Sequence, residues 1–470
     1  MIDHSQPKIL MIVERSTTPY YQGSSQLWLG PLYILSYLEQ KGIDGDFVDR
    51  SVEPLRVIDY SSYDVVGFSV NVNNIKKSLA TAKEIKRVHS HIKIIFGGPF
   101  ASSYPQLLMG EEYIDAVMAG EGEETFYEFV TGKKINDIQG LYYRENGLVH
   151  FTGTRPWIKD LDSLPFPALH KTKIQEYQNF STKASPISYI ITTRGCPYPC
   201  TFCFHNMGKK WRARSPQNVV DEMEWQINTF GVKEIGIVDD NFTLDRKRVI
   251  EICDEIIRRN IKVNLQFSNG VRADFVDDEM MKKLRDAGLW VINFAPESGS
   301  PQTIERLKKG FKEDDMQKAI AIAKKYGVAT EIFLMLGFPW ETKEDYKQTL
   351  SLPYELDVDF VGLHRYIPFP GTPLQSSELT QADKENLFSD RLYNSFAYDR
   401  KDEVSQMMRA FYRKWYSSPR RVLRIAKMLN LYSPKKLFNP DMLKSIMVHS
   451  WLKLGSLSWQ NNSSLTYTKG

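Results

Sequence analysis

The stretch Gly195-Cys196-Pro197-Tyr198-Pro199-Cys200-Thr201-Phe202-Cys203 gathers three of the chain's four cysteines into one short loop. It directly follows residues 187–192, a run of apolar and β-branched residues that is typical of a buried strand. The glycine and the two prolines disfavour regular structure and suit a loop that wraps a bulky group. The sequence therefore predicts a metal centre held by Cys196, Cys200 and Cys203 at the carboxyl end of a strand.

The number of thiols narrows the chemistry of this centre. A closed structural zinc site has four protein ligands, and a purely redox iron–sulfur cube is held by four cysteines. Three thiolates on a four-iron cube leave one iron open, and an open iron can bind a substrate. The alternative is a zinc site in which His205 is the fourth ligand.

Beyond the cysteines, strand-like and helix-like segments alternate as far as residue 375. The expected strands are 187–192, 234–238, 263–267, 290–294, 330–336 and 360–366, with helices such as 216–230 and 246–260 between them. Six strand–helix units are fewer than the eight of a closed barrel, so we expect a partial (β/α)6 TIM-type barrel. The chemistry of such barrels collects where the strands end, so residues there are candidate site residues.

Most of these strands end in polar segments. In chain order, the segments after the second, third and fourth strands supply these candidate residues: Asp239, Asp240, Ser268, Arg272, Glu297 and Ser298. The fifth and sixth strands run into residues 336–342 and 368–374, which combine glycine with proline. Taken singly, each segment has a plain structural explanation, such as an ordinary strand-to-helix turn.

The spacing C-x3-C-x2-C, with the aromatic Phe202 before the last cysteine, resembles the signature of the radical S-adenosylmethionine (SAM) superfamily. The strand-end segments occur in the family's order, including an acidic loop at Asp239 and Asp240, and the resemblance covers residues 187–375. One departure is Ala295, where the family's G-x-E-S-G segment usually has glycine.

The resemblance implies a [4Fe-4S] cluster on the three cysteines, with SAM on the open iron. It implies that Glu297 and Ser298 bind the amino and ribose groups of SAM. It also implies that Ser268 and Arg272 contact the SAM carboxylate or the edge of the cluster. A radical made from SAM can take hydrogen from an unactivated carbon, and the protein then supplies orientation and excludes water.

Residues 1–150 show a second α/β pattern. Short apolar runs at 9–13, 46–49, 65–70, 92–96 and 116–119 alternate with helical segments, which predicts a doubly wound, Rossmann-like domain. Ligands of such sheets bind at the carboxyl ends of the strands. Those ends carry the candidate residues Ser69, Val70, Asn71, Gly97, Gly98, Gly120 and Glu121. No G-x-G-x-x-G motif follows the first strand, which argues against a dinucleotide.

Residues 8–130 resemble the cobalamin-binding domain that precedes the radical SAM barrel in one large subfamily. The D-x-H-x-x-G motif, which supplies an axial histidine in other cobalamin enzymes, is absent from the chain. The resemblance therefore implies a cobalamin whose lower face packs near Ser69, Val70 and Asn71 rather than on that histidine. The alternative is a degenerate domain that binds nothing.

The same patterns divide the chain into parts. The proline-rich residues 151–186 form a linker between the domain of residues 1–150 and the barrel of residues 187–375, and residues 376–470 form a helical C-terminal region. Residues 401–470 contain 13 Lys and Arg against 3 Asp and Glu, a net charge of +10. We expect this region to pack on the barrel with a basic outer face. Contact with an anionic membrane surface is the alternative.

Composition places the chain among soluble globular proteins, and its sparse cysteines are typical of the reducing cytoplasm. Four cysteines in 470 residues argue against a disulfide framework, and Cys253 has the helical spacing of a core residue. We find neither a signal peptide nor an apolar run long enough to cross a membrane. A nucleic-acid partner is not expected, because no recognised binding module accompanies the basic residues.

The leading hypothesis is a cobalamin-dependent radical SAM enzyme that methylates an unactivated carbon of a small-molecule or lipid substrate. An electron donor such as flavodoxin or ferredoxin would supply the electrons. Oxidative cyclisation or rearrangement with the same cofactors is the first alternative. A non-catalytic iron–sulfur or corrinoid sensor is the second.

Overall fold

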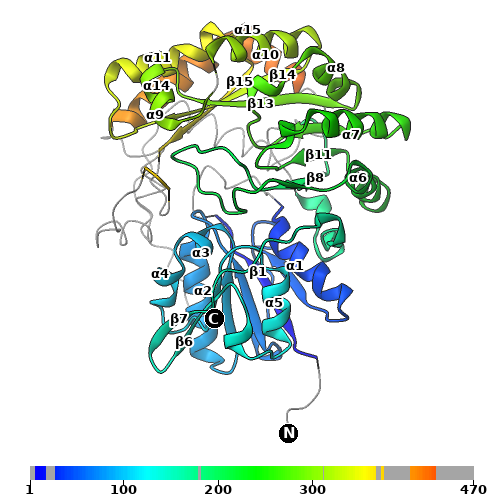
Figure 1. Cartoon of the computed structure of the whole chain (residues 1–470), viewed down its shortest axis with the longest axis vertical. Coiled ribbons are helices and arrows are strands. Elements are labelled where there is room, and N and C mark those ends of the chain that lie inside the picture. The colour runs from blue at the N-terminus through cyan, green and yellow to red at the C-terminus, as the bar shows by residue number, and fades with distance from the viewer. Residues whose placement is uncertain are drawn as a thin grey trace, which may run out of the picture.

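The computed structural model describes residues 6–16, 27–177, 182–310, 312–366, 372–374 and 403–429. These residues form two α/β units, one above the other in Figure 1, and the helices after residue 402 lie against the upper unit. This arrangement confirms the predicted order of a Rossmann-like unit, a partial barrel and a helical C-terminal part. No helix of the described residues is long and apolar enough to cross a membrane.

The lower unit is built on a seven-stranded sheet with the order β2-β1-β3-β4-β5-β6-β7. Its strands are β1 (Ile9–Val13), β2 (Asp46–Asp49), β3 (Val65–Ser69), β4 (Lys93–Gly97), β5 (Ala116–Met118), β6 (Leu141–Glu145) and β7 (Leu148–Phe151). The first five are parallel, as expected of a doubly wound fold. The antiparallel β6–β7 hairpin, which was not predicted, extends the sheet at one edge.

Helices cover both faces of this sheet. One face carries α1 (Leu29–Gln40) and α5 (Glu123–Val130), and the other carries α2 (Ile75–Val88), α3 (Pro99–Ser103) and α4 (Pro105–Met109). Successive side chains of a strand point to opposite faces. Ile9 and Met11 therefore pack with α1, whereas Leu10 and Ile12 pack with α2. The unbroken apolar run of β1 is what burial on both faces requires.

The upper unit is a six-stranded parallel sheet with the order β15-β14-β13-β12-β11-β8, as predicted for a partial barrel. Its strands are β8 (Ile187–Ile190), β11 (Glu234–Ile237), β12 (Asn264–Phe267), β13 (Leu289–Glu297), β14 (Ala329–Leu336) and β15 (Phe360–Arg365). The intervening helices are α6 (Pro216–Phe230), α7 (Arg246–Arg258), α8 (Asp278–Asp286), α9 (Pro301–Leu307), α10 (Glu313–Lys325) and α11 (Lys343–Glu355). Strands β8 and β15 do not pair with each other, so the barrel stays open between them.

Short polar side chains begin most of the barrel helices directly after the strand-end loops. Each of these N-cap side chains accepts a hydrogen bond from the backbone N–H three residues further on: Ser215, Asp245, Asp277, Ser300 and Thr342. Such caps satisfy backbone donors that the first helical turn leaves unpaired. The loops that carry the candidate site residues are therefore held at both ends.

The open edge of the barrel is covered by α14 (Glu403–Tyr416). The hydroxyl of Tyr412 accepts a hydrogen bond from Leu363 N at 2.8 Å and lies 3.4 Å from Val361 O, so it pairs with the exposed backbone of β15. The fully buried Trp415 packs against Tyr354 of α11. Covering an edge strand in this way blocks pairing with another chain.

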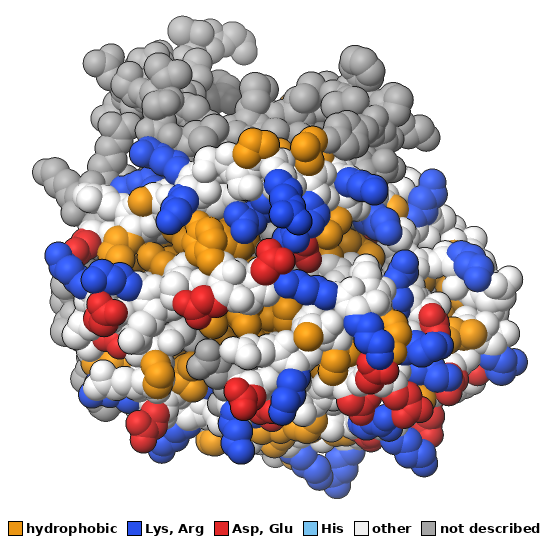
Figure 2. Space-filling view, turned by 90° about the horizontal axis from the view of Figure 1, so that it is seen from above, with side chains coloured by type: hydrophobic (Ala, Val, Ile, Leu, Met, Phe, Trp, Pro, Cys, Tyr) orange, Lys and Arg blue, Asp and Glu red, His pale blue; other side chains and the backbone are white. Residues whose placement is uncertain are grey.

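The following helix, α15 (Pro419–Met428), packs on the amino-terminal parts of β13 and β14. Its Ile425, with the adjacent Leu429, forms an apolar cluster with Trp290 and Val291. Arg424 contacts Asp359 at 2.9 Å, so part of the positive charge serves this packing. Figure 2, seen from above Figure 1, shows Lys and Arg side chains mixed with acidic and apolar ones. For residues 403–429 the predicted packing on the barrel is confirmed, and the rest of the basic region lies outside the described residues.

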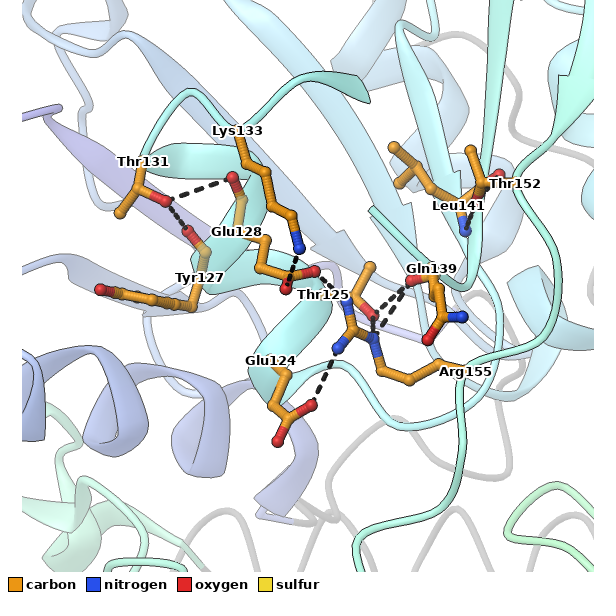
Figure 3. A network of polar contacts seen from close by, with 10 residues as sticks. All are labelled: Glu124, Thr125, Tyr127, Glu128, Thr131, Lys133, Gln139, Leu141, Thr152 and Arg155. Atoms are coloured by element: carbon orange, nitrogen blue, oxygen red, sulfur yellow. Dashed lines mark hydrogen bonds and ion pairs between the residues drawn. The ribbon is translucent and has the colours of Figure 1, made fainter. Parts of the chain in front are cut away.

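The connector after β7 is tied to the lower unit by Arg155 (Figure 3). Its guanidinium donates to Glu124 at 2.8 Å, to Glu128, and to the hydroxyl of Thr125 at 2.8 Å. The guanidinium also donates to the carbonyl of Gln139, at 3.2 Å. The chain that leads to the barrel therefore departs from the α5 side of the lower unit.

Candidate functional site

The cysteine loop is a closed loop whose two ends pair with each other. Strands β9 (Thr193–Arg194) and β10 (Arg212–Ala213) form an antiparallel ladder, and residues 195–211 lie between them. Gly195 has a φ of 86°, and a Cβ there would lie 2.5 Å from the carbonyl oxygen of Lys210. Only glycine meets both conditions, so this residue shapes the loop.

The three cysteines of this loop differ in exposure. Cys200 is buried, Cys196 is half-buried, and Cys203 is exposed. In the described ranges, no three His, Cys, Asp or Glu side chains meet closely enough to hold a single metal ion. The three thiols are still neighbours, because Cys196 and Cys200 both contribute to raising the pKa of Cys203, and three neighbouring thiols suit a larger four-iron cluster. For His205, the fourth ligand of the alternative zinc site, Nε2 lies 2.9 Å from the carbonyl oxygen of Tyr198.

The two aspartates after β11 hold the base of the cysteine loop. Asp239 accepts a hydrogen bond from Thr192 N at 2.6 Å, and Asp240 accepts one from Gly195 N at 3.0 Å. Burial raises the pKa of both carboxyls, and these donors oppose the shift. Both residues were predicted as cofactor contacts, and the structure gives their carboxylates partners within the protein.

The side chains of two further candidates, Arg272 and Ser298, also make contacts within the protein. Arg272 donates to Asp274 at 2.7 Å and to the carbonyl of Lys309 at 2.6 Å, and its guanidinium lies 4.0 Å from the centre of the Tyr198 ring. Ser298 is fully buried, and its hydroxyl lies 2.8 Å from that of Thr349. Ser268 is half-buried at the end of β12. Arg272 therefore joins the cysteine loop to the segment after α9.

Glu297, a predicted SAM contact, lies close enough to the cysteine loop for its charge to raise the pKa of the Cys200 thiol. It ends β13 with a φ of 69°, a left-handed conformation that is rare for a side chain of this size. Such strained positions are concentrated at functional sites. Its carboxylate accepts a hydrogen bond from Lys309 Nζ at 2.7 Å.

Lys309 was missed by the sequence analysis. Its ammonium lies 5.6 Å from the centre of the Phe202 ring in the cysteine loop. Burial alone would lower the pKa of Lys309, but Glu297 and Cys200 reverse the shift and raise it. Burial raises the pKa of the Cys200 thiol, and the charge of Lys309 opposes that effect. A buried cation beside the thiols favours their charged forms.

A cavity of about 290 Å³ lies between the two units. Six of the seven residues predicted at the carboxyl ends of the lower strands line it: Ser69, Asn71, Gly97, Gly98, Gly120 and Glu121. Val70, the seventh, is fully buried in the core and is absent from this lining. The upper unit contributes Asn206 and Met207 of the cysteine loop. The predicted ligand edge of the lower sheet therefore faces the predicted metal loop.

The lining of this interdomain cavity suits a mainly apolar surface of a ligand that also carries a few polar groups. Met11, Phe68 and Ile95 supply apolar surface, and several glycines keep the backbone accessible. The side-chain oxygen of Asn206 is buried without a hydrogen-bond partner among the described residues, so a polar group of a ligand would satisfy it. These residues fit a corrinoid.

Two of the lining residues also have local structural roles. Gly98 has a φ of 97°, and a Cβ there would lie 2.9 Å from the carbonyl oxygen of Val70. Asn71 accepts a hydrogen bond from Asn73 N at 2.8 Å and so closes a turn. The backbone itself explains the choice of these residues, independently of a ligand.

Comparison with known proteins agrees with this architecture. Residues 190–352 match the radical SAM superfamily, and residues 23–130 match the B12 binding domain. An uncharacterized methyltransferase of Pyrococcus horikoshii is 31% identical over 381 residues, which cover 78% of this chain and 82% of that protein. An anaerobic magnesium-protoporphyrin IX monomethyl ester cyclase of Rubrivivax gelatinosus is 27% identical over 400 residues, which cover 80% of this chain and 71% of the cyclase.

Solved structures share the fold. The radical SAM methyltransferase TsrM from Kitasatospora setae, solved with cobalamin and a [4Fe-4S] cluster, has a TM-score of 0.63 at 19% identity, covering 79% of this chain and 77% of TsrM. The cobalamin-dependent SAM radical enzyme OxsB has a TM-score of 0.63 at 21% identity, covering 83% of this chain and 56% of OxsB. With its B12-binding unit, its radical SAM barrel and its methyltransferase relative, the chain belongs to the cobalamin-dependent radical SAM methyltransferase family.

Proposed function

We propose that the chain methylates an unactivated carbon of a small-molecule or lipid substrate, using a [4Fe-4S] cluster, SAM and cobalamin. Cys196, Cys200 and Cys203 would hold the cluster, and the interdomain cavity would hold the corrinoid. When bound, SAM at the cluster supplies a hydrogen-abstracting radical, and the corrinoid supplies the methyl group. The observation that carries the proposal is the position of the cysteine loop, which lines the same cavity as the carboxyl ends of the lower sheet.

The residues around the thiols would bind SAM and exclude water from it. Lys309 places a buried positive charge beside Cys200 and Glu297, which suits a site that holds thiolates and a carboxylate. Phe202 of the cysteine loop packs with the buried apolar side chains Leu307 and Phe338. An apolar surround of this kind lowers the local dielectric constant and protects a reactive species from water.

The first experiment is anaerobic reconstitution with iron, sulfide and hydroxocobalamin, followed by incubation with SAM and a reductant such as flavodoxin or ferredoxin. We expect a [4Fe-4S] cluster held by the three cysteines, a bound corrinoid, and formation of 5′-deoxyadenosine. A protein that takes up the cluster but no corrinoid would remove the methylation part. To find the substrate, metabolites of a deletion strain and its parent can be compared for one additional methyl group.

A second experiment tests the residues assigned to SAM. Glu297→Ala should retain the cluster and weaken SAM binding, because the carboxylate lies beside the cysteine loop without supplying a ligand to it. Unchanged SAM affinity in this variant would refute its role. Glu251→Ala is a matched control, since Glu251 is exposed on α7 and its carboxylate pairs with Lys247 of the same helix.

Oxidative cyclisation is the second candidate function. The observation in its favour is the similarity to anaerobic cyclases, including one from Cereibacter sphaeroides that is 26% identical over 360 residues. Product mass separates the two functions, because methylation adds one methyl group whereas oxidative cyclisation removes hydrogen.

A further inference from the structure

The two ends of the cysteine loop carry arginines that point to the same carboxylate of the other unit. Arg194 and Arg212 are directly paired across the β9–β10 ladder. Arg194 Nη1 lies 2.8 Å from Glu121 Oε1, and Arg212 Nη1 lies 2.8 Å from the same oxygen. Glu121 belongs to the loop between β5 and α5, at the carboxyl edge of the lower sheet. One carboxylate thus holds both ends of the loop that carries the three cysteines.

Further contacts complete this network. Arg194 Nη2 lies 2.7 Å from Glu123 Oε1, and Arg212 Nη1 donates to the carbonyl of Ile158 at 2.6 Å. The second oxygen of Glu121 accepts a hydrogen bond from Ile158 N at 2.8 Å. Arg212 Nη2 also donates to the carbonyl of Met207 inside the cysteine loop, at 3.0 Å. The network therefore joins the lower unit, the connector and the loop itself.

An aromatic contact reinforces the same junction. Trp157 of the connector packs against Gly208 of the cysteine loop, where a Cβ would lie 2.8 Å from the indole. The guanidinium of Arg212 lies 5.3 Å from the centre of the Trp157 ring. The close approach requires glycine at position 208, so the loop and the connector fit each other in one arrangement.

The four charged side chains of this network are almost completely buried. Their exposed fractions are 6% for Arg194, 4% for Arg212, 6% for Glu121 and 5% for Glu123. Two positive and two negative groups make the cluster neutral. Exposed ion pairs contribute little to stability, whereas loss of one partner from a buried pair leaves the other charge buried and uncompensated. The network therefore resists any movement of the loop away from the lower unit.

We propose that Glu121, Glu123, Arg194 and Arg212 are positioning residues that fix the cysteine loop over the interdomain cavity and so set the separation between cluster and corrinoid. The inference rests on the proposed function for the identity of the two cofactors. It assigns Glu121, predicted from the sequence as a cobalamin contact, to the junction between the units. Catalysis that needs two cofactors at a set distance depends on such pre-organisation.

The first test needs no cofactor. Amide hydrogen exchange of residues 195–211 is measured in the native chain, in Glu121→Gln and in Glu124→Gln. Glu124 lies in the first turn of α5, which begins two residues after Glu121, and it pairs with Arg155 rather than with the arginines of the cysteine loop, which makes it the matched control. Glu121→Gln should speed exchange in the loop on the order of 100-fold, because it leaves two buried arginines with one carboxylate. Equal exchange in the two variants would overturn the proposal.

The second test reads the distance between the cofactors. Native and variant proteins are reconstituted with iron, sulfide and hydroxocobalamin, then reduced so that cluster and cobalt are paramagnetic. Electron paramagnetic resonance should show a spin–spin interaction in the native chain and in Glu124→Gln, and a weakened one in Glu121→Gln. An unchanged interaction in Glu121→Gln would overturn the inference. If the native chain binds no corrinoid, the proposed function fails instead, and the exchange test still decides the structural part.

A neutral double variant guards against misfolding. Glu121→Gln/Arg212→Gln removes one charge of each sign, so it should fold even where the single variant does not. Its thermal midpoint should lie closer to that of the native chain than the midpoint of Glu121→Gln does. Its loop exchange and spin–spin interaction should remain altered, because the contacts between the loop and the lower unit are still missing. Native values for both readouts would overturn the proposal.

Discussion

Replacing Lys309 with methionine tests how the site stabilises its buried carboxylate. The Lys309 ammonium lies 2.7 Å from Glu297, and the two side chains are 13% and 10% exposed. At that distance two unit charges attract by about 6 kcal/mol at an effective dielectric constant of ~20. Part of this attraction offsets the cost of removing both groups from water. We expect Lys309→Met to lower the free energy of unfolding by about 3 kcal/mol, because Glu297 is left buried and unpaired.

The assay is equilibrium urea unfolding of the apoprotein under reducing conditions. The double variant Lys309→Met/Glu297→Gln is the matched control, since it has no charge at either position and should recover most of the lost stability. A loss below about 1 kcal/mol in the single variant would mean that solvent screens the pair as it screens a surface ion pair. That result would refute the reasoning and remove the argument for a buried cation beside the thiols.

Three further predictions concern the loop and its surroundings. Gly195→Ala should prevent iron uptake on reconstitution, because its φ is 86° and a Cβ would lie 2.5 Å from a carbonyl oxygen. The control Gly231→Ala, whose Cβ would have no atom within 4 Å, should still take up iron and lose only about 1–2 kcal/mol of unfolding free energy. Cys200→Ala should abolish cluster assembly measured by iron content, whereas Cys253→Ala, in the core of α7, should not. Burial raises the pKa of Glu341 to about 7, so the folded chain keeps a proton that the unfolded chain releases, and stability should fall as the pH rises from about 4.5 to about 7. Glu341→Gln should remove this pH dependence of stability. At pH 8 the variant should be about 1–2 kcal/mol more stable than the native chain, a figure reduced because the carboxyl is partly exposed to solvent. Equal urea midpoints of the two proteins at pH 8 would contradict this.

The elements of the fold were largely predictable because their signals are local. A strand buried on both faces must be apolar throughout, as β1 is, and most barrel helices begin at a capping side chain such as Ser215 or Thr342. The β6–β7 hairpin was missed because its strands are partly exposed and include polar residues. Neither strand is therefore an unbroken apolar run like β1.

The candidate site was only partly predictable. The cysteine loop and the strand-end segments are contiguous in sequence, and their order follows the strands. Their contacts are not contiguous: Lys309 lies far along the chain from Cys200, and Arg194 and Arg212 are 73 and 91 residues from Glu121. Asp239 and Asp240 illustrate the same limit, because residues predicted to contact a cofactor have buried protein donors as partners.

The amino-acid sequence by itself determined the two α/β units, their order and the three thiols, because hydrophobic periodicity and ligand spacing act over a few residues. Only the tertiary structure decided which charges meet. Buried ionic groups must find partners wherever the packed chain brings them, and that pairing sets Glu121 against the arginines of the cysteine loop and Lys309 against Glu297. The position of the metal loop over the cavity of the lower unit is therefore a property of the assembled fold.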